Sequence, residues 1–139
     1  MPEISYLKIL VPTAGPAPAN EKAEYIMKLA SRLRGEILAL HIVTTSEDRA
    51  KCEEGNKALK IFEEVGIRYN VKVSSYLAEG ELLPTIIKYA EDKDVDLIVM
   101  GASEDGRMIA EWIVSDLRYR TDLPVVIEPH GFGTLLDGL

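Results

Sequence analysis

The sequence predicts an α/β protein, a three-layer sandwich in which helices cover both faces of a five-stranded parallel sheet. Short apolar runs alternate with longer stretches of helical periodicity from one end of the chain to the other, as in repeated strand–helix–strand units. The segment 36–43 (EILALHIV) is almost continuously apolar, which is typical of a parallel strand covered on both faces. Such units join by right-handed crossovers, and a parallel sheet follows.

The first half of the chain contains three predicted strands. The segment 6–12 (YLKILVP) is the first strand, and the segment 71–77 is the third. The apolar residues of the third strand alternate, which favours a position at an edge of the sheet. Asn20 is a good N-cap for the first helix, and Gly35 and Gly66 stand where glycines would end the first and second helices.

The second half continues the alternation. A third helix follows Gly80, and Pro84 fits its first turn because a proline there loses no hydrogen bond. The segment 95–100 (VDLIVM) is the fourth strand, and Pro124 opens the fifth. The helix between these two strands is expected to direct one apolar stripe into the core, formed by Ile109, Trp112, Ile113 and Leu117.

The chain length and composition favour a single domain over residues 1–139, with a core at about 6–128 and a glycine-rich tail at 129–139. A formal net charge of −7 without a run of lysine and arginine argues against nucleic-acid binding. No apolar run approaches the roughly 18 residues of a membrane span, and a single cysteine, Cys52, allows no intramolecular disulfide. We therefore expect a cytoplasmic protein.

In a sheet of this kind, ligands bind outside the carboxyl ends of the strands, where the strand order reverses. The loops after the first and fourth strands are therefore the predicted site. These loops also carry a resemblance: KILVPTAGPAPANEKAEYIMKLA, VDLIVMGASEDG and DLPVVIEP are similar, in order and spacing, to segments of the universal stress protein family. The resemblance runs from about residue 6 to residue 128, and it implies a Rossmann-like sheet of order 3-2-1-4-5.

The resemblance also implies a partner. Members of the family dimerise through the last strand, which here contains Val125, Val126 and Ile127. An apolar edge strand must be covered, so a homodimer is expected. The alternative is that the C-terminal tail covers this edge. Further protein partners are implied without being identified.

The resemblance implies a candidate nucleotide-binding pocket in the two loops and at the end of the second strand. Family members that bind ATP have an aspartate in the first loop and a glycine-rich motif after the fourth strand. Glycines there let backbone N–H groups approach phosphates closely. The pocket residues of this chain are Pro12, Thr13, Ala14, Gly15, Ile42, Val43, Gly101, Ser103, Arg107 and Ser115.

Three positions depart from the ATP-binding pattern. Ala14 stands in place of the aspartate, and Glu104 and Val114 stand in place of the second and third glycines. A carboxylate about 4 Å from a phosphate costs on the order of 4 kcal/mol at an effective dielectric of about 20, and a β-branched valine is strained at positive φ. Arg107 could attract an anion, and its alternative role is an ion pair with Glu104 or Asp105.

These departures predict a non-catalytic, regulatory homodimer of the stress response that has lost or weakened ATP binding and needs no cofactor. The alternative is a sensor that binds an adenine nucleotide, ATP or AMP with Mg²⁺, in the loops after the first and fourth strands. The base would contact the apolar wall and the backbone at the end of the second strand. No catalytic residue and no metal site is identified, although weak ATP hydrolysis is left open. His41 is expected to be a core or pocket-wall residue.

Overall fold

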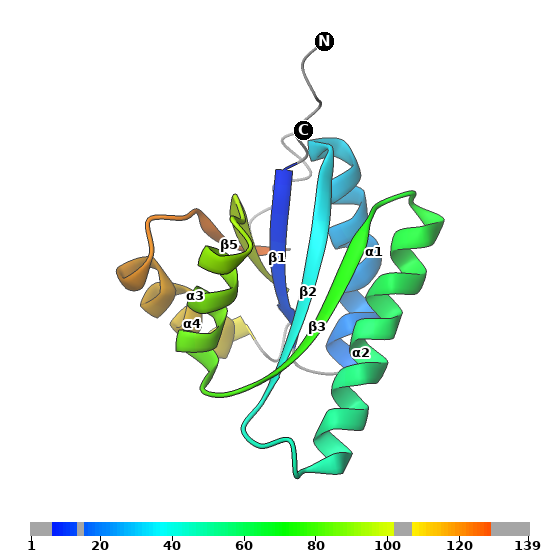
Figure 1. Cartoon of the computed structure of the whole chain (residues 1–139). Helices are drawn as coiled ribbons and strands as arrows, with labels where there is room; N and C mark the ends of the chain where they lie inside the picture. Colours follow the sequence, from blue (N-terminus) through cyan, green and yellow to red (C-terminus); the bar gives the residue numbers. More distant parts are fainter. Residues whose placement is uncertain (1–6, 14–15, 102–106, 129–139) are drawn as a thin grey trace.

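The structure is a computed structural model that describes residues 7–13, 16–101 and 107–128. Strands and helices alternate along the chain (Figure 1). In chain order they are β1 (Leu7–Thr13), α1 (Pro16–Leu33), β2 (Gly35–Val43), α2 (Arg49–Arg68), β3 (Val73–Glu79), α3 (Leu82–Asp92), β4 (Leu97–Gly101), α4 (Arg107–Arg120) and β5 (Val125–Glu128).

The five strands form one parallel sheet of order β3-β2-β1-β4-β5. This confirms the predicted fold class and strand order, and it places the third strand at an edge. β1 pairs with β2 from Leu7↔Gly35 to Thr13↔His41, and it pairs with β4 at Ile9↔Leu97. The direction of the winding therefore reverses between β1 and β4.

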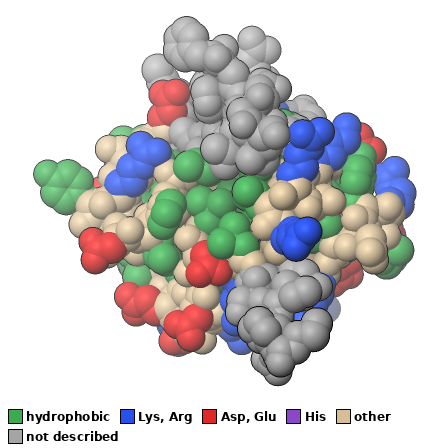
Figure 2. Space-filling view, turned by 90° about the horizontal axis from the view of Figure 1, so that it is seen from above, with side chains coloured by type: hydrophobic (Ala, Val, Ile, Leu, Met, Phe, Trp, Pro, Cys, Tyr) green, Lys and Arg blue, Asp and Glu red, His purple; other side chains and the backbone are tan. Residues whose placement is uncertain are grey.

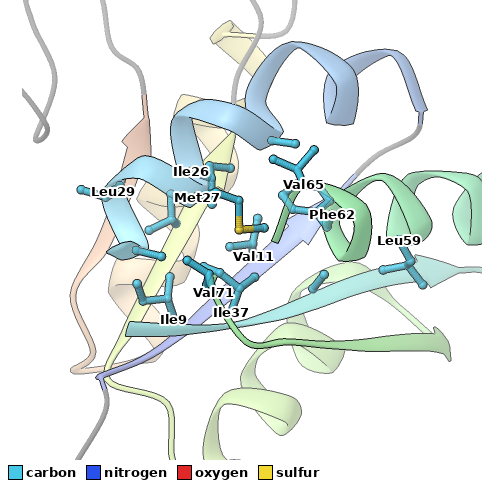
Figure 3. Packing of buried hydrophobic residues seen from close by; sticks show 14 of the residues in the cluster. Ile9, Val11, Ile26, Met27, Leu29, Ile37, Leu59, Phe62, Val65 and Val71 are labelled. Atoms are coloured by element: carbon cyan, nitrogen blue, oxygen red, sulfur yellow. The ribbon is translucent and has the colours of Figure 1, made fainter. Parts of the chain in front are cut away.

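Helices α1 and α2 cover one face of the sheet, and α3 and α4 cover the other (Figure 1). Alternate residues of β1 serve the two layers, because successive side chains of a strand point to opposite faces. Ile9 and Val11 pack against α1 and α2 with Met27 and Phe62 (Figure 3). On the opposite face, a second cluster contains Leu10, Leu40, Ile86, Ile98, Val114 and Leu117.

The predicted role of Gly35 as the end of the first helix is wrong. The residue in the left-handed conformation is Arg34, with φ 54°, and Gly35 is already the first residue of β2. A Cβ atom on Gly35 would lie 2.9 Å from Cδ1 of Ile9 and 3.0 Å from the carbonyl oxygen of Leu7. The glycine therefore allows β2 to approach β1 closely, instead of providing a positive φ.

Gly66 was likewise predicted to end the second helix, but α2 continues to Arg68, and Asn70 takes the positive φ of 56°. A Cβ atom on Gly66 would lie 2.4 Å from a methyl group of Val73. The missing side chain lets α2 lie against β3. Both glycines therefore allow close packing, and neither ends the preceding helix as predicted.

The start of α1 and the phase of α4 also differ from prediction. α1 begins at Pro16, so Asn20 lies inside the helix instead of capping it. Trp112 is 72% exposed instead of lying in the core. The buried residues Val114 and Leu117 set the phase of α4, and Trp112 lies about 200° around the helix from Val114.

The end of the molecule that carries the amino ends of the strands shows hydrophobic side chains near its centre, with acidic and basic side chains around them (Figure 2). Within the described ranges, no helix combines the length and the apolar character needed to cross a membrane.

Candidate functional site

The carboxyl ends of β1, β2 and β4 meet at one edge of the sheet, the lower edge in Figure 1. Pro12 and Thr13 end β1, Ile42 and Val43 end β2, and Gly101 ends β4. Pro12 and Val43 are buried, whereas Thr13 and Ile42 are half-buried. The structure therefore brings these five predicted residues to the edge where α/β sheets bind ligands.

The two loops that complete this edge are only partly described. Ala14, Gly15, Ser103 and Glu104 lie outside the described residues. Arg107 is the first residue of α4, and this backbone position is what the structure describes of it. A positively polarised helix start therefore follows the loop after β4.

Sequence reasoning missed a contact between the ends of β1 and β2. Nδ1 of His41 lies 2.8 Å from the carbonyl oxygen of Thr13. A carbonyl only accepts, so Nδ1 carries the hydrogen and donates it. His41 is 6% exposed, as expected of a core or pocket-wall residue, and the bond fixes the last carbonyl group of β1.

Helix α2 has a gap that fits the His41 ring. A Cβ atom on Gly55 would lie 2.2 Å from Cδ2 of that ring. A glycine inside a helix costs roughly 1 kcal/mol relative to alanine. Gly55 therefore weakens α2 by about this amount, and its missing side chain leaves room for the His41 ring. No local sequence signal links Gly55 to His41, because the two meet only in the folded sheet and helix pair.

The loop after β2 is held by the end of β3. The backbone N–H of Ser46 donates to Oε2 of Glu79 at 2.7 Å, and the N–H of Gly80 donates to the carbonyl of Val43 at 2.9 Å. Hydrogen bonds from the Ser46 hydroxyl and then from its backbone lower the pKa of the Glu79 carboxyl. One carbonyl at the end of β2 is therefore already engaged.

The predicted residues Val114 and Ser115 lie far inside a helix. α4 begins at Arg107, so Ser115 lies about 12 Å along the helix axis from its start. Val114 is 2% exposed and packs in the core cluster with Leu117, whereas Ser115 is exposed. Backbone N–H groups this deep in a helix bond to the preceding turn, and they are not free to contact a phosphate.

Acidic residues gather at the opposite edge of the sheet. Asp92 ends α3, Asp94 follows with φ 52°, and Asp96 precedes β4. Asp96 accepts from the N–H of Lys8 at 2.8 Å, so it joins the amino ends of β1 and β4. Across the described part of the chain, no three His, Cys, Asp or Glu side chains are grouped to hold a metal ion.

The fold and this edge define a class: α/β proteins with strand order 3-2-1-4-5, whose reversal between β1 and β4 forms the ligand-binding edge. The model of the universal stress protein family matches residues 5–115, which is most of the chain. The chain therefore belongs to the universal stress protein family.

Known relatives agree with this assignment. Universal stress protein MJ0531 of Methanocaldococcus jannaschii is 30% identical over 111 residues, which are 70% of this chain and 65% of that protein. The chain thus spans just under two thirds of this relative. A universal stress family protein from Burkholderia pseudomallei has a TM-score of 0.73 at 21% identity, over 93% of this chain and 100% of that chain.

A second similar structure holds a ligand. The universal stress protein from Archaeoglobus fulgidus in complex with dAMP has a TM-score of 0.62 at 21% identity, over 89% of this chain and 98% of that chain. At this level of identity the likeness establishes a shared fold.

Proposed function

We propose that this universal stress protein is a non-catalytic, regulatory homodimer that has lost or weakened ATP binding and acts in the cytoplasm through other proteins. The observation that supports weak ATP binding is the position of Val114. At the third glycine position of the ATP-binding motif, this chain has a core valine in the eighth residue of α4.

The position of Val114 matters because a phosphate cradle needs free backbone N–H groups. Such groups occur in the first turn of a helix or in a glycine-rich loop. In this chain the helix extends over the position, and the side chain is buried in the core. Ala14 and Glu104 act in the same direction, because the first removes a polar contact and the second adds a negative charge.

A thermal melt tests this proposal. A ligand at 100 times its dissociation constant stabilises a fold by about 2.7 kcal/mol, which raises the melting temperature of a domain of this size by several degrees or more. We expect no rise with about 1 mM MgATP for ligand-free protein, and no release of ADP. A rise of several degrees would overturn the proposal.

A matched variant makes the melt more informative. Ala14→Asp combined with Glu104→Gly restores the aspartate and one glycine and keeps Val114. Because Val114 stays inside α4, we expect this double variant, like the parent chain, to show no thermal shift with MgATP. A shift gained by the double variant would mean that Ala14 and Glu104, and not Val114, weaken ATP binding.

A second candidate function is an adenine-nucleotide sensor, and a specific observation favours it. The residues expected to hold the base, at the ends of β1 and β2, lie together at the carboxyl edge. One similar structure is described in complex with dAMP and another with AMP bound. A thermal shift with AMP but not with MgATP, or a co-purified ligand absorbing near 260 nm, would favour the sensor.

A further inference from the structure

The outer edge of β5 can be assigned group by group. Ile98 pairs with Val125, and the N–H of Ile98 donates to the carbonyl of Pro124 at 2.9 Å. Pro124 and Val126 therefore direct their backbone groups toward β4, because successive residues of a strand face opposite sides in the sheet plane. Val125 and Ile127 direct their backbone N–H and C=O groups outward.

One of the outward groups is already occupied. Nε and Nη2 of Arg118 donate to the carbonyl oxygen of Val125, at 3.1 Å and 2.7 Å. A carbonyl oxygen has two lone pairs, and this fork of two donors uses both. Val125 as a whole is 2% exposed, so among the described residues the outward groups of β5 that remain for pairing are those of Ile127, and Val125 has no free acceptor.

This pattern discriminates between registers of a two-fold dimer. Two copies of β5 related by a two-fold axis pair antiparallel, and the outward residues exchange hydrogen bonds. If the axis passes through Val125 or Val126, an N–H of the second copy points at the Val125 carbonyl. That carbonyl is filled by Arg118, so both registers place a third donor on one acceptor.

A third register avoids the conflict. With the axis at Ile127, this residue pairs with its own copy, and the N–H that this register would require at the Val125 carbonyl belongs to the sequence position two residues after Ile127. That position is a proline, which has no backbone N–H to donate. The Val125 carbonyl would then lack a donor from the partner strand, and Arg118 supplies that donor.

We propose that Arg118 sets the register of strand pairing in the homodimer, with Ile127 on the two-fold axis. This inference rests on the proposed homodimer through β5. The partner is a second copy of this chain, recognised by an edge that is self-complementary once Arg118 fills the Val125 carbonyl.

Disulfide cross-linking tests the register. In a Cys52→Ser background, Ile127→Cys places two thiols in a hydrogen-bonded antiparallel pair with Cα atoms about 5.5 Å apart, within the range that a disulfide spans. Val126→Cys places its two thiols on diagonal positions about 8 Å apart, outside that range. We expect oxidation to cross-link the Ile127→Cys dimer at least ten times faster than the Val126→Cys dimer.

Two further cross-linking experiments test the register with other pairs of positions. A mixture of Val126→Cys and Glu128→Cys proteins is expected to form the mixed disulfide, because these positions face each other in the proposed register. Adding Arg118→Met to Val126→Cys frees the Val125 carbonyl, and we expect cross-linking of Val126→Cys to rise at least tenfold. Thermal melts establish that each variant is folded.

The outcomes separate the two proposals. Cross-linking of Val126→Cys as fast as Ile127→Cys, with Arg118 intact, overturns the register and leaves the strand dimer standing. No cross-link in any arm, from a protein that sediments as a dimer, overturns both the register and the strand interface. A wild-type protein that sediments as a monomer overturns the homodimer itself.

Discussion

Ser75 has a buried hydroxyl oxygen with no hydrogen-bond partner in the described part of the structure. A buried polar group without a partner costs about 1–3 kcal/mol. We expect Ser75→Ala to raise the free energy of unfolding by about 1 kcal/mol in urea denaturation. Ser74→Ala, the neighbour on the opposite face of β3, is the control and is expected to change stability by less than about 0.5 kcal/mol. A loss of stability in Ser75→Ala would reveal a partner for the hydroxyl.

Because Gly55 contacts His41, the effect of Gly55→Ala on stability should depend on whether the His41 ring is present. Alanine is favoured over glycine inside a helix by roughly 1 kcal/mol, but its Cβ would lie 2.2 Å from the ring, and overpacking costs roughly 1–3 kcal/mol. We expect Gly55→Ala to destabilise the wild type by up to about 2 kcal/mol, which is the upper overpacking cost less the gain in helix propensity. In a His41→Ala background the same change should stabilise by up to about 1 kcal/mol, and a double-mutant cycle measures the difference. Equal effects in both backgrounds would rule out the steric explanation.

Glu79 makes stability depend on pH. Its pKa is lowered in the folded protein by the hydrogen bonds from Ser46. A lowered folded pKa adds stability that is present above the unfolded pKa and disappears as the pH falls through the folded pKa. We expect Glu79→Gln to be less stable than wild type at pH 7, and the difference between the two proteins to shrink in acid, as the pH falls through the lowered pKa of Glu79. Chemical denaturation between pH 7 and pH 3 measures this, and a constant gap across that range would contradict it.

Helix α4 contains the residue whose substitution bears most directly on ATP binding. Val114→Gly would restore a glycine of the ATP-binding motif, but Val114 is a buried residue of the helix. The change removes a buried side chain and adds a helix glycine, which together cost about 3 kcal/mol. We expect Val114→Gly to lower stability by that amount without creating a thermal shift with MgATP.

Val114→Ala is the matched control for this variant, because it shortens the side chain and keeps the helix propensity. It is expected to cost about 1 kcal/mol less than Val114→Gly. A stable Val114→Gly protein that binds MgATP would mean that α4 begins later in the chain than Arg107.

The elements differ in how much of them can be predicted from sequence. Strands were found to within about two residues because buried parallel strands are continuous in apolar residues, and their order followed from the family resemblance. Helix ends were predicted less well. Gly35 and Gly66 are required by close packing against Ile9 and Val73, and no local sequence pattern reveals such packing. Trp112 was misplaced because an apolar residue at helical spacing does not show which of two neighbouring phases is buried.

The candidate site, too, could be predicted only in part. Its edge could be predicted, since strand order and direction fix where the ends of β1, β2 and β4 meet. The contacts that shape it, from His41 to Thr13 and from Ser46 to Glu79, join residues 28 and 33 positions apart. Such pairs depend on the register of neighbouring strands, which is a property of the folded sheet.

The association of two copies of the chain depends on which edge of the sheet remains open. The outward backbone groups of β5 belong to Val125 and Ile127, whereas the N–H of Val126 faces β4. A proline at Val126 would therefore break the internal ladder of the fold and cost at least about 1 kcal/mol. A proline at Ile127 would remove an outward donor and leave the pairing with β4 intact.

We therefore expect Ile127→Pro to be monomeric at concentrations at which the wild type sediments as a dimer, while its circular dichroism spectrum stays that of the wild type. Dimerisation stabilises a folded chain by mass action, so the melting temperature of the wild type should rise with protein concentration, and that of Ile127→Pro should not. Sedimentation velocity and melts at two concentrations measure both effects. A folded Ile127→Pro protein that still sediments as a dimer would place the interface on another surface, with the exposed Trp112 and Tyr119 side of α4 as the next to test.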